Sequence, residues 1–193
     1  ILFLFIGMNM NAQNEKISFG IKAGLNLSNF VGDVEDMDAK IGFNAVFTLD
    51  YAITGNLFLL TGLDFTTKGC KYSEDDYKET VNSMFLQLPI HAAYKFEITD
   101  QSRLVVNAGP YIAYGIGGKV KYEEDGESEK FDFFGSEEDG GMKRFDFGLG
   151  LGVGFEYDKF KVGIGYDFGL ANIGRDDVDV KTRNGYLTVG YRF

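Results

Sequence analysis

The chain has 193 residues, 45% of them hydrophobic, with 26 Gly, 2 Pro, 19 Phe, 11 Tyr, no Trp and a net charge of −10. The hydrophobic fraction excludes a disordered chain, and the length allows one domain or at most two small ones. The negative charge argues against a nucleic-acid-binding protein, because phosphate contacts need a basic face. Abundant glycine and aromatic residues favour strands over helices.

The first residues predict the end of a secretory signal peptide. Residues 1–6 read ILFLFI, and the small residue Ala12 follows where a cleavage site is expected. The apolar run is too short to span a bilayer as a helix, which needs about 20 residues. A buried N-terminal strand is the alternative. We expect residues 1–12 to be a partial signal peptide and residues 13–193 to be one exported β-barrel domain.

From Ile17 onward, apolar and polar residues alternate in eight segments, which is the pattern of strands with two different faces. In one segment, Leu149, Leu151 and Val153 alternate with glycines. The predicted strands cover residues 17–28, 41–51, 57–68, 84–96, 104–115, 145–157, 160–168 and 186–193.

The connections between these strands alternate in length. Short turns are predicted at 53–56, 99–101 and 158–159, and longer loops join the other pairs. This alternation is typical of a transmembrane barrel. We therefore predict an all-β, eight-stranded, antiparallel up-and-down transmembrane β-barrel, with short periplasmic turns, four longer extracellular loops and both termini at the turn side.

The two strand faces indicate which side meets lipid. The polar face carries little charge and much glycine, which suits a crowded lumen, whereas the bulky apolar face suits lipid. A soluble lipocalin-like barrel, the alternative, would point its large apolar side chains inward. Aromatic residues near both ends of the apolar faces predict two interfacial girdles. They are Tyr51, Tyr94, Tyr157, Phe160, Tyr191 and Phe193 at the turn side, and Phe43, Phe65, Tyr114, Phe145 and Phe168 at the loop side.

Several ionisable residues share the lumen face, and we expect them to form a polar network because buried charges must be paired. They are Lys22, Asp50, Asp64, His91, Lys95, Asp146, Glu156, Asp167 and Arg192. An eight-stranded barrel is just filled by side chains. With Phe58, Phe85, Tyr111 and Tyr186 also able to occupy the lumen, we expect no large open pore. A narrow porin that conducts ions or small solutes is the alternative.

His91 is the only histidine, and it is the sole candidate base for a lipid-modifying barrel enzyme. Such an enzyme needs a nucleophile and an acid beside the base. No G-x-S-x-G motif is present, and the glycines at 148–154 follow a strand period. Cys70 has no second cysteine to pair with. We expect no enzyme activity, no cofactor and no metal site.

Most Asp and Glu residues lie in the predicted loops. A solvated, self-repelling surface accounts for them. Loose binding of divalent cations is the alternative, although no loop has the spacing of an EF-hand.

Four stretches carry a resemblance to a known family: FGIKAGLNLSNF (19–30), FLQLPIHAAYKF (85–96), NAGPYIAYGIGG (107–118) and GYLTVGYRF (185–193). They resemble the Bacteroidetes-type outer-membrane β-barrel proteins, also called the porin family or PorT-like proteins. The resemblance covers the mature chain and implies an eight-stranded outer-membrane barrel. A PorT-like role would imply assistance to protein secretion.

The chain's final stretch, residues 184–193, ends in an ordered aromatic strand rather than a polar tail. We expect it to pair with the first strand and remove both sheet edges. Tyr191 and Phe193 resemble the C-terminal signal read by the outer-membrane assembly machinery. The other expected partners are outer-membrane lipid and glycolipid and an unknown extracellular or secretion partner. We expect a monomer, and a structural or interaction role ahead of conduction.

Overall fold

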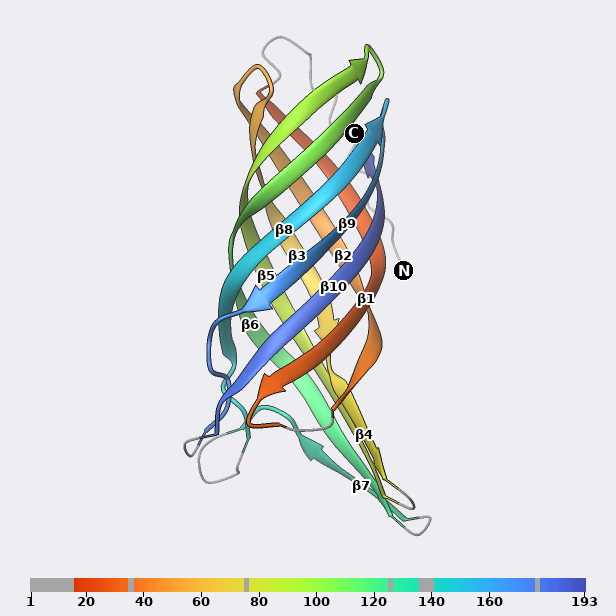
Figure 1. Cartoon of the computed structure of the whole chain (residues 1–193), viewed down its shortest axis with the longest axis vertical. Coiled ribbons are helices and arrows are strands. Elements are labelled where there is room, and N and C mark those ends of the chain that lie inside the picture. The colour runs from red at the N-terminus through yellow and green to blue at the C-terminus, as the bar shows by residue number, and fades with distance from the viewer. Residues whose placement is uncertain (1–15, 35–36, 75–76, 125–126, 136–140, 176–177) are drawn as a thin grey trace, which may run out of the picture.

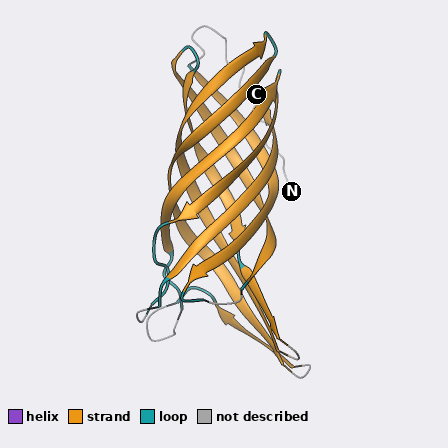
Figure 2. Cartoon of the chain, viewed as in Figure 1, coloured by secondary structure: helices purple, strands orange, loops and turns teal. Residues whose placement is uncertain are grey.

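A computed structural model describes residues 16–34, 37–74, 77–124, 127–135, 141–175 and 178–193, and Figure 2 shows that strands make up most of them. Among these residues, no helix is long and apolar enough to cross a membrane. The strands are β1 (Ile17–Gly32), β2 (Asp38–Thr54), β3 (Leu57–Lys68), β4 (Cys70–Glu74), β5 (Tyr77–Thr99), β6 (Ser102–Glu124), β7 (Glu127–Asp132), β8 (Phe145–Tyr157), β9 (Phe160–Gly169) and β10 (Val180–Arg192).

Eight of these strands close into an antiparallel ring in the order β1-β2-β3-β5-β6-β8-β9-β10 (Figure 1). The ring closes where β1 pairs with β10, with Ile21 opposite Tyr191 and Leu25 opposite Leu187. Closure leaves the wall without an open edge, so every strand of the ring has two neighbours. The predicted eight-stranded barrel is confirmed.

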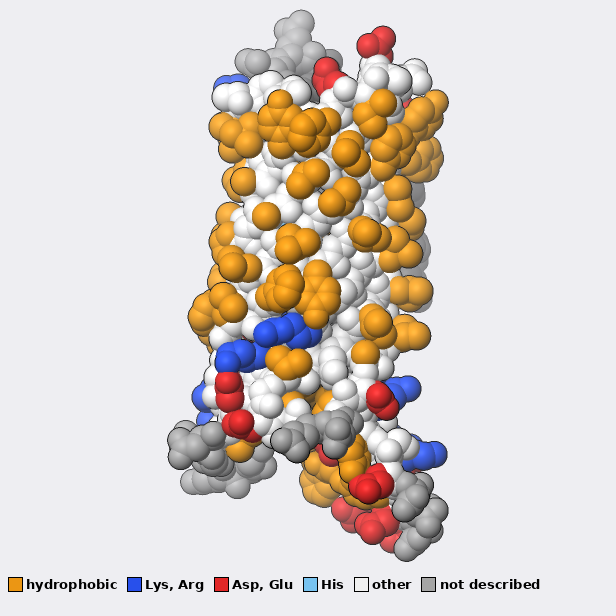
Figure 3. All heavy atoms as spheres, viewed as in Figure 1, with side chains coloured by type: hydrophobic (Ala, Val, Ile, Leu, Met, Phe, Trp, Pro, Cys, Tyr) orange, Lys and Arg blue, Asp and Glu red, His pale blue; other side chains and the backbone are white. Residues whose placement is uncertain are grey.

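Burial in this barrel is inverted relative to a soluble protein. Leu25 is 62% exposed and Phe43 is 53% exposed, whereas Asn26 and Asn44 beside them are only 2% and 4% exposed. Figure 3 shows hydrophobic side chains spread over the barrel wall, with charged side chains gathered toward its two ends. This surface requires an apolar solvent, so the apolar face is the one that meets lipid.

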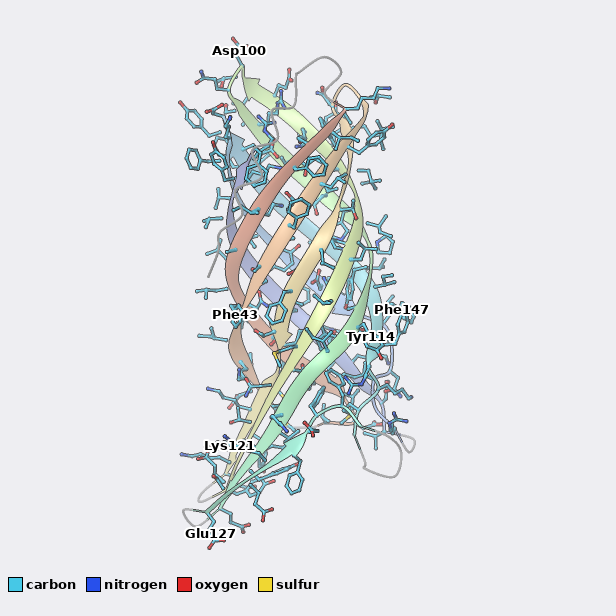
Figure 4. All side chains as sticks on the ribbon, turned by 180° about the vertical axis from the view of Figure 1, so that it is seen from behind. Phe43, Asp100, Tyr114, Lys121, Glu127 and Phe147 are labelled. Atoms are coloured by element: carbon cyan, nitrogen blue, oxygen red, sulfur yellow. The ribbon has the colours of Figure 1, made fainter. Side chains whose placement is uncertain are left out.

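Aromatic side chains pair on the outer wall near both ends. The Phe160 and Tyr191 ring centroids lie 5.5 Å apart near one end, and the Phe43 and Phe65 centroids lie 5.8 Å apart near the other. Figure 4 shows Phe43, Tyr114 and Phe147 on the outside of the barrel. These positions match the expected girdles.

Glycines on the lumen face leave room for large inward side chains. A Cβ at Gly148 would meet the Phe168 carbonyl oxygen and lie 2.8 Å from the Tyr111 ring, and one at Gly165 would meet the Tyr186 ring. Real Cβ contacts are longer than this, so a larger residue at either position would clash with its neighbours. The alternating glycines therefore fit the interior of a narrow barrel.

Two of the predicted loops are wrong. Residues 70–74 and 77–83 are strand, and β6 continues to Glu124 and then pairs with β7. The N-terminal part of β5 and the C-terminal part of β6, with β4 and β7, form a four-stranded sheet that extends obliquely past one rim, at the bottom of Figure 1. We call it the projecting sheet, and this end of the barrel the loop end. Strands that extend beyond the bilayer do not need an apolar face toward lipid. Their sequences therefore lack the alternation of apolar and polar residues that predicts a strand.

The end of the chain lies at the opposite, turn end. β10 begins at Val180, earlier than the predicted start at Tyr186, and Phe193 donates its backbone N–H to the carbonyl of Phe19 at 3.0 Å. This bond extends the predicted pairing with the first strand to the last residue. The role of Tyr191 and Phe193 as an assembly signal remains a prediction. The predicted signal peptide, residues 1–12, lies outside the described residues.

Candidate functional site

A layer of ion pairs crosses the lumen near the turn end. The Lys95 Nζ lies 2.8 Å from Asp50 and 2.9 Å from Glu156. Lys161 Nζ reaches the same two carboxylates at 2.6 and 3.4 Å. The four side chains come from β2, β5, β8 and β9, so the layer links strands across the whole barrel. It neutralises charges that would be costly to bury alone.

A second layer lies toward the loop end around Lys68. Its Nζ is 3.1 Å from Asp146, and neither side chain is exposed. Asp146 also accepts hydrogen bonds from Thr182 at 2.9 Å and Tyr111 at 3.4 Å. The ammonium lies 4.9 Å from the Tyr111 ring centroid and 5.1 Å from that of Phe85. The cation, the carboxylate and the two rings occupy the lumen at this height.

A polar cavity of about 110 Å³ lies between the two layers. Gln87 donates to Asp167 at 3.0 Å, and the Nδ1 of His91 lies 2.9 Å from Asn107. The side-chain oxygen Oε1 of Gln87 and the Nε2 of His91 have no hydrogen-bond partner among the described residues. The cavity is large enough, and polar enough, to hold water.

An apolar cluster lies at the loop end of the barrel, next to the Lys68 layer. We call it the mouth cluster; its buried members are Phe30, Cys70, Val81, Phe85, Tyr111, Ala113, Phe133, Phe134, Ile173 and Val180. The Phe134 ring lies 5.3 Å from Phe85 and 4.8 Å from Phe133, centroid to centroid. Backbone bonds hold the connecting segments over the opening, including Met142 N–H to Phe133 O at 2.8 Å.

The structure brings together most of the residues predicted for the lumen network. Asp50, Lys95 and Glu156 form one layer, and Asp146 belongs to the other. Lys22, Asp64, His91 and Asp167 line the cavity. Arg192 lies apart, because its guanidinium donates to the Asp158 carbonyl at the turn end, at 3.0 Å.

Two lysines central to the layers, Lys68 and Lys161, were missing from the predicted network. Both occupy polar-face positions of the same period-two pattern, so the alternation itself contains the signal that would have included them. The mouth cluster was also not predicted. Its only sequence signal is the Phe133–Phe134 pair within an acidic stretch.

His91 lies in the cavity between the two layers, among carboxylate and threonine side chains such as Asp64, Asp167 and Thr61. The described residues that line its cavity include no serine and no cysteine. His91 itself is hydrogen-bonded to an amide rather than to an acid. Within the described ranges, no cluster of three or more His, Cys, Asp or Glu side chains is placed to hold a metal ion.

The projecting sheet carries opposite charges on its two faces. Lys71, Thr80, Lys121 and Lys130 lie side by side across its four strands. Side chains two residues away share this face. We call this side the basic face; its lysines are Lys71, Lys78, Lys119, Lys121 and Lys130.

The other side of the sheet combines carboxylates with aromatic rings. We call it the acidic face; it carries Tyr72, Glu74, Tyr77, Glu79, Tyr122, Glu124, Glu127, Glu129 and Phe131. Tyr77 lies 6.3 Å from Tyr122, and Tyr122 lies 5.8 Å from Phe131, between ring centroids. These rings form a continuous row that stiffens the sheet.

Two glutamates of the projecting sheet have pKa values that depart from the usual one in opposite directions. A hydrogen bond from Lys121, with the charges of Lys78 and Lys130, holds the pKa of Glu123 on the basic face below its usual value. Burial on the acidic face raises the pKa of Glu79. The lysines therefore act together as a local positive field.

One family model matches most of the chain. The family described as outer membrane protein beta-barrel domain matches residues 11–175. The chain is similar to the attachment invasion locus protein Ail of Yersinia pestis, with 22% identity over 91% of this chain and 98% of that one, and a TM-score of 0.44. It is also similar to Neisserial surface protein A, with 19% identity over 92% and 98% of the two chains, and a TM-score of 0.46. The comparison with curated proteins gave no significant match.

Proposed function

The chain belongs to the outer membrane protein beta-barrel domain family, and from this premise we propose that it is a closed, non-enzymatic barrel that displays the projecting sheet at the cell surface. It is an integral protein of the bacterial outer membrane. The proposed role is structural or one of interaction with partners, without a large open pore. The acidic face, with its row of aromatic rings, would be the surface offered to an extracellular partner.

The observation that carries this proposal is the closure of the lumen at three heights. The mouth cluster, the Lys68–Asp146 layer and the Lys95–Asp50–Glu156 layer follow one another along the barrel. Each is buried and bonded across strands, so opening a path would break several contacts at once. Partners would therefore bind to the surface beyond the rim and not inside the lumen.

Labelling of one introduced cysteine at a time tests the proposed display. Glu127 is exposed on the projecting sheet, and Asp100 lies at the opposite end of the barrel (Figure 4). We expect a membrane-impermeant maleimide to modify Glu127→Cys on intact cells, and Asp100→Cys only after the outer membrane is permeabilised. The wild-type chain is the control, because Cys70 is 1% exposed and should stay unlabelled. The reverse labelling pattern would exclude surface display.

A narrow porin is the second candidate, and the polar cavity between the two layers favours it. Water in that cavity could support a small leak if either layer rearranged. This function predicts unitary current steps from the pure protein, which a closed barrel does not produce.

The remaining partners are also proposals. Closure of the ring within one chain supports a monomer, because the wall offers no free edge to a second copy. Tyr191 and Phe193 are 36% and 63% exposed on the outer wall, where assembly machinery could read them. The resemblance to PorT-like proteins would add help with protein secretion, and a deletion strain with unchanged secretion would exclude that role.

A further inference from the structure

The basic face of the projecting sheet continues the lipid-facing side of the barrel. On β5, Lys78 lies an even number of positions from Met84 and Leu86, so the three side chains share one face of the strand. Met84 and Leu86 are exposed on the outer wall. The sheet leans away from the barrel axis beyond the rim in both views (Figures 1 and 4), and Figure 4 shows Lys121 on this extension. The basic face is thus directed outward, next to the edge of the apolar band.

A groove of about 470 Å³ lies where this face meets the barrel wall. Ile41, Phe43 and Met84 supply apolar lining, and the lysines of the rim are Lys40, Lys119, Lys121 and Lys130. Apolar lining that continues into the membrane, with cations above it, matches a molecule that has acyl chains and an anionic head. A soluble anion would use the lysines but leave the apolar lining unexplained.

Existing ion pairs do not neutralise this face. Lys119 pairs with Asp132 and Lys121 with Glu123, each at 2.7 Å, and the paired side chains are between 34% and 73% exposed. Exposed pairs of this kind are weak and exchange readily for another anion. Among the described residues, Lys71, Lys78 and Lys130 have no carboxylate within salt-bridge distance. The chain as a whole has a net charge of −10, so the positive charge of the basic face is a local feature of this surface.

We propose that the basic face and its groove bind a phosphorylated glycolipid of the outer leaflet, with the phosphates on Lys119, Lys121 and Lys130 and an acyl chain along Ile41, Phe43 and Met84. This inference rests on the proposed surface display, since it requires the loop end to be at the outer leaflet. Phosphates are recognised by lysine as compact point charges, and juxtamembrane lysines bind anionic lipid surfaces. Lipid bound here would hold the projecting sheet at a fixed angle to the membrane and leave the acidic face free.

Native mass spectrometry of the full folded chain in detergent tests the proposal. The probe is a bisphosphorylated glucosamine-disaccharide lipid, compared with its dephosphorylated form. The variant Lys119→Gln/Lys121→Gln/Lys130→Gln should lose at least roughly tenfold in affinity, since each lysine near an anionic surface contributes measurably. The matched control, Lys16→Gln/Arg103→Gln/Lys159→Gln, removes the same charge at the turn end and should bind as the wild type does. A second variant, Lys71→Gln/Lys78→Gln, spares the rim of the groove and should show a smaller loss.

Four results would overturn the proposal: equal binding by the first variant, an equal loss in the control, equal binding of the dephosphorylated lipid, or competition by inorganic phosphate at a concentration equal to that of the lipid. The last would point to a free anion rather than a lipid. Heat-modifiable gel mobility shows whether each variant is folded, and the Lys71→Gln/Lys78→Gln result stands if the triple variant is not. The measurement in detergent is independent of orientation in the cell, so its failure is distinguishable from failure of surface display.

Discussion

Replacing Asp146 with asparagine is expected to destabilise the folded barrel by about 3–5 kcal/mol, because the substitution leaves the Lys68 ammonium buried without its counter-charge. Both side chains are fully buried, and their 3.1 Å ion pair joins β3 to β8 across the lumen. The neighbouring Phe85 and Tyr111 rings offset part of the loss. Urea unfolding in lipid vesicles, followed by heat-modifiable gel mobility, measures the change.

The double variant Lys68→Met/Asp146→Asn is the control for this experiment. It removes both charges and keeps a side chain of similar length at position 68, so most of the lost stability should return. If the single variant unfolds at the urea concentration of the wild type, the Lys68–Asp146 pair does not hold the lumen together.

Replacing Phe134 with alanine is expected to loosen the mouth cluster. Phe134 is 4% exposed, and its ring packs against Phe85 and Phe133. Removing a buried phenylalanine ring costs about 3–5 kcal/mol. Hydrogen exchange of the Met142 and Ile173 amides, which donate to Phe133 and Val180, should then accelerate by roughly a hundredfold or more, at tenfold per 1.4 kcal/mol.

Phe131→Ala is the matched control for the Phe134 variant. It removes the same ring three residues away, but Phe131 is 53% exposed and packs on Tyr122 of the projecting sheet. Exchange of the Met142 and Ile173 amides should stay close to the wild-type rate. Equal acceleration in both variants, or none in Phe134→Ala, would show that the mouth cluster does not close the barrel.

The barrel wall could be predicted from the sequence because lipid and lumen impose opposite demands on alternate residues. Leu149 and Leu151 face out while Gly148 and Gly150 face in, and no other environment demands that pattern over eight segments. Successive residues of a strand point to opposite faces, so the alternation in the sequence shows which residues, including the charged ones, point inward.

The projecting sheet and the pairings inside the lumen could not be read from the same pattern. In residues 119–132, lysines alternate with tyrosine, phenylalanine and glutamate, so both strand faces are polar or mixed and the segment resembles a charged loop. An Asp-Gly pair within this segment is a turn signal that predicts a hairpin. Partners such as Lys68 and Asp146 lie on strands that are not neighbours in the wall, and their contact depends on the height of each residue along the barrel.

Single-channel recording in planar bilayers tests the closed-barrel account most directly. The pure, folded wild-type protein should insert without unitary current steps, under conditions in which an open porin control conducts. The mouth cluster and the two ion-pair layers are the physical reason for this expectation. Reproducible unitary steps from the wild-type chain would contradict closure and favour the narrow porin.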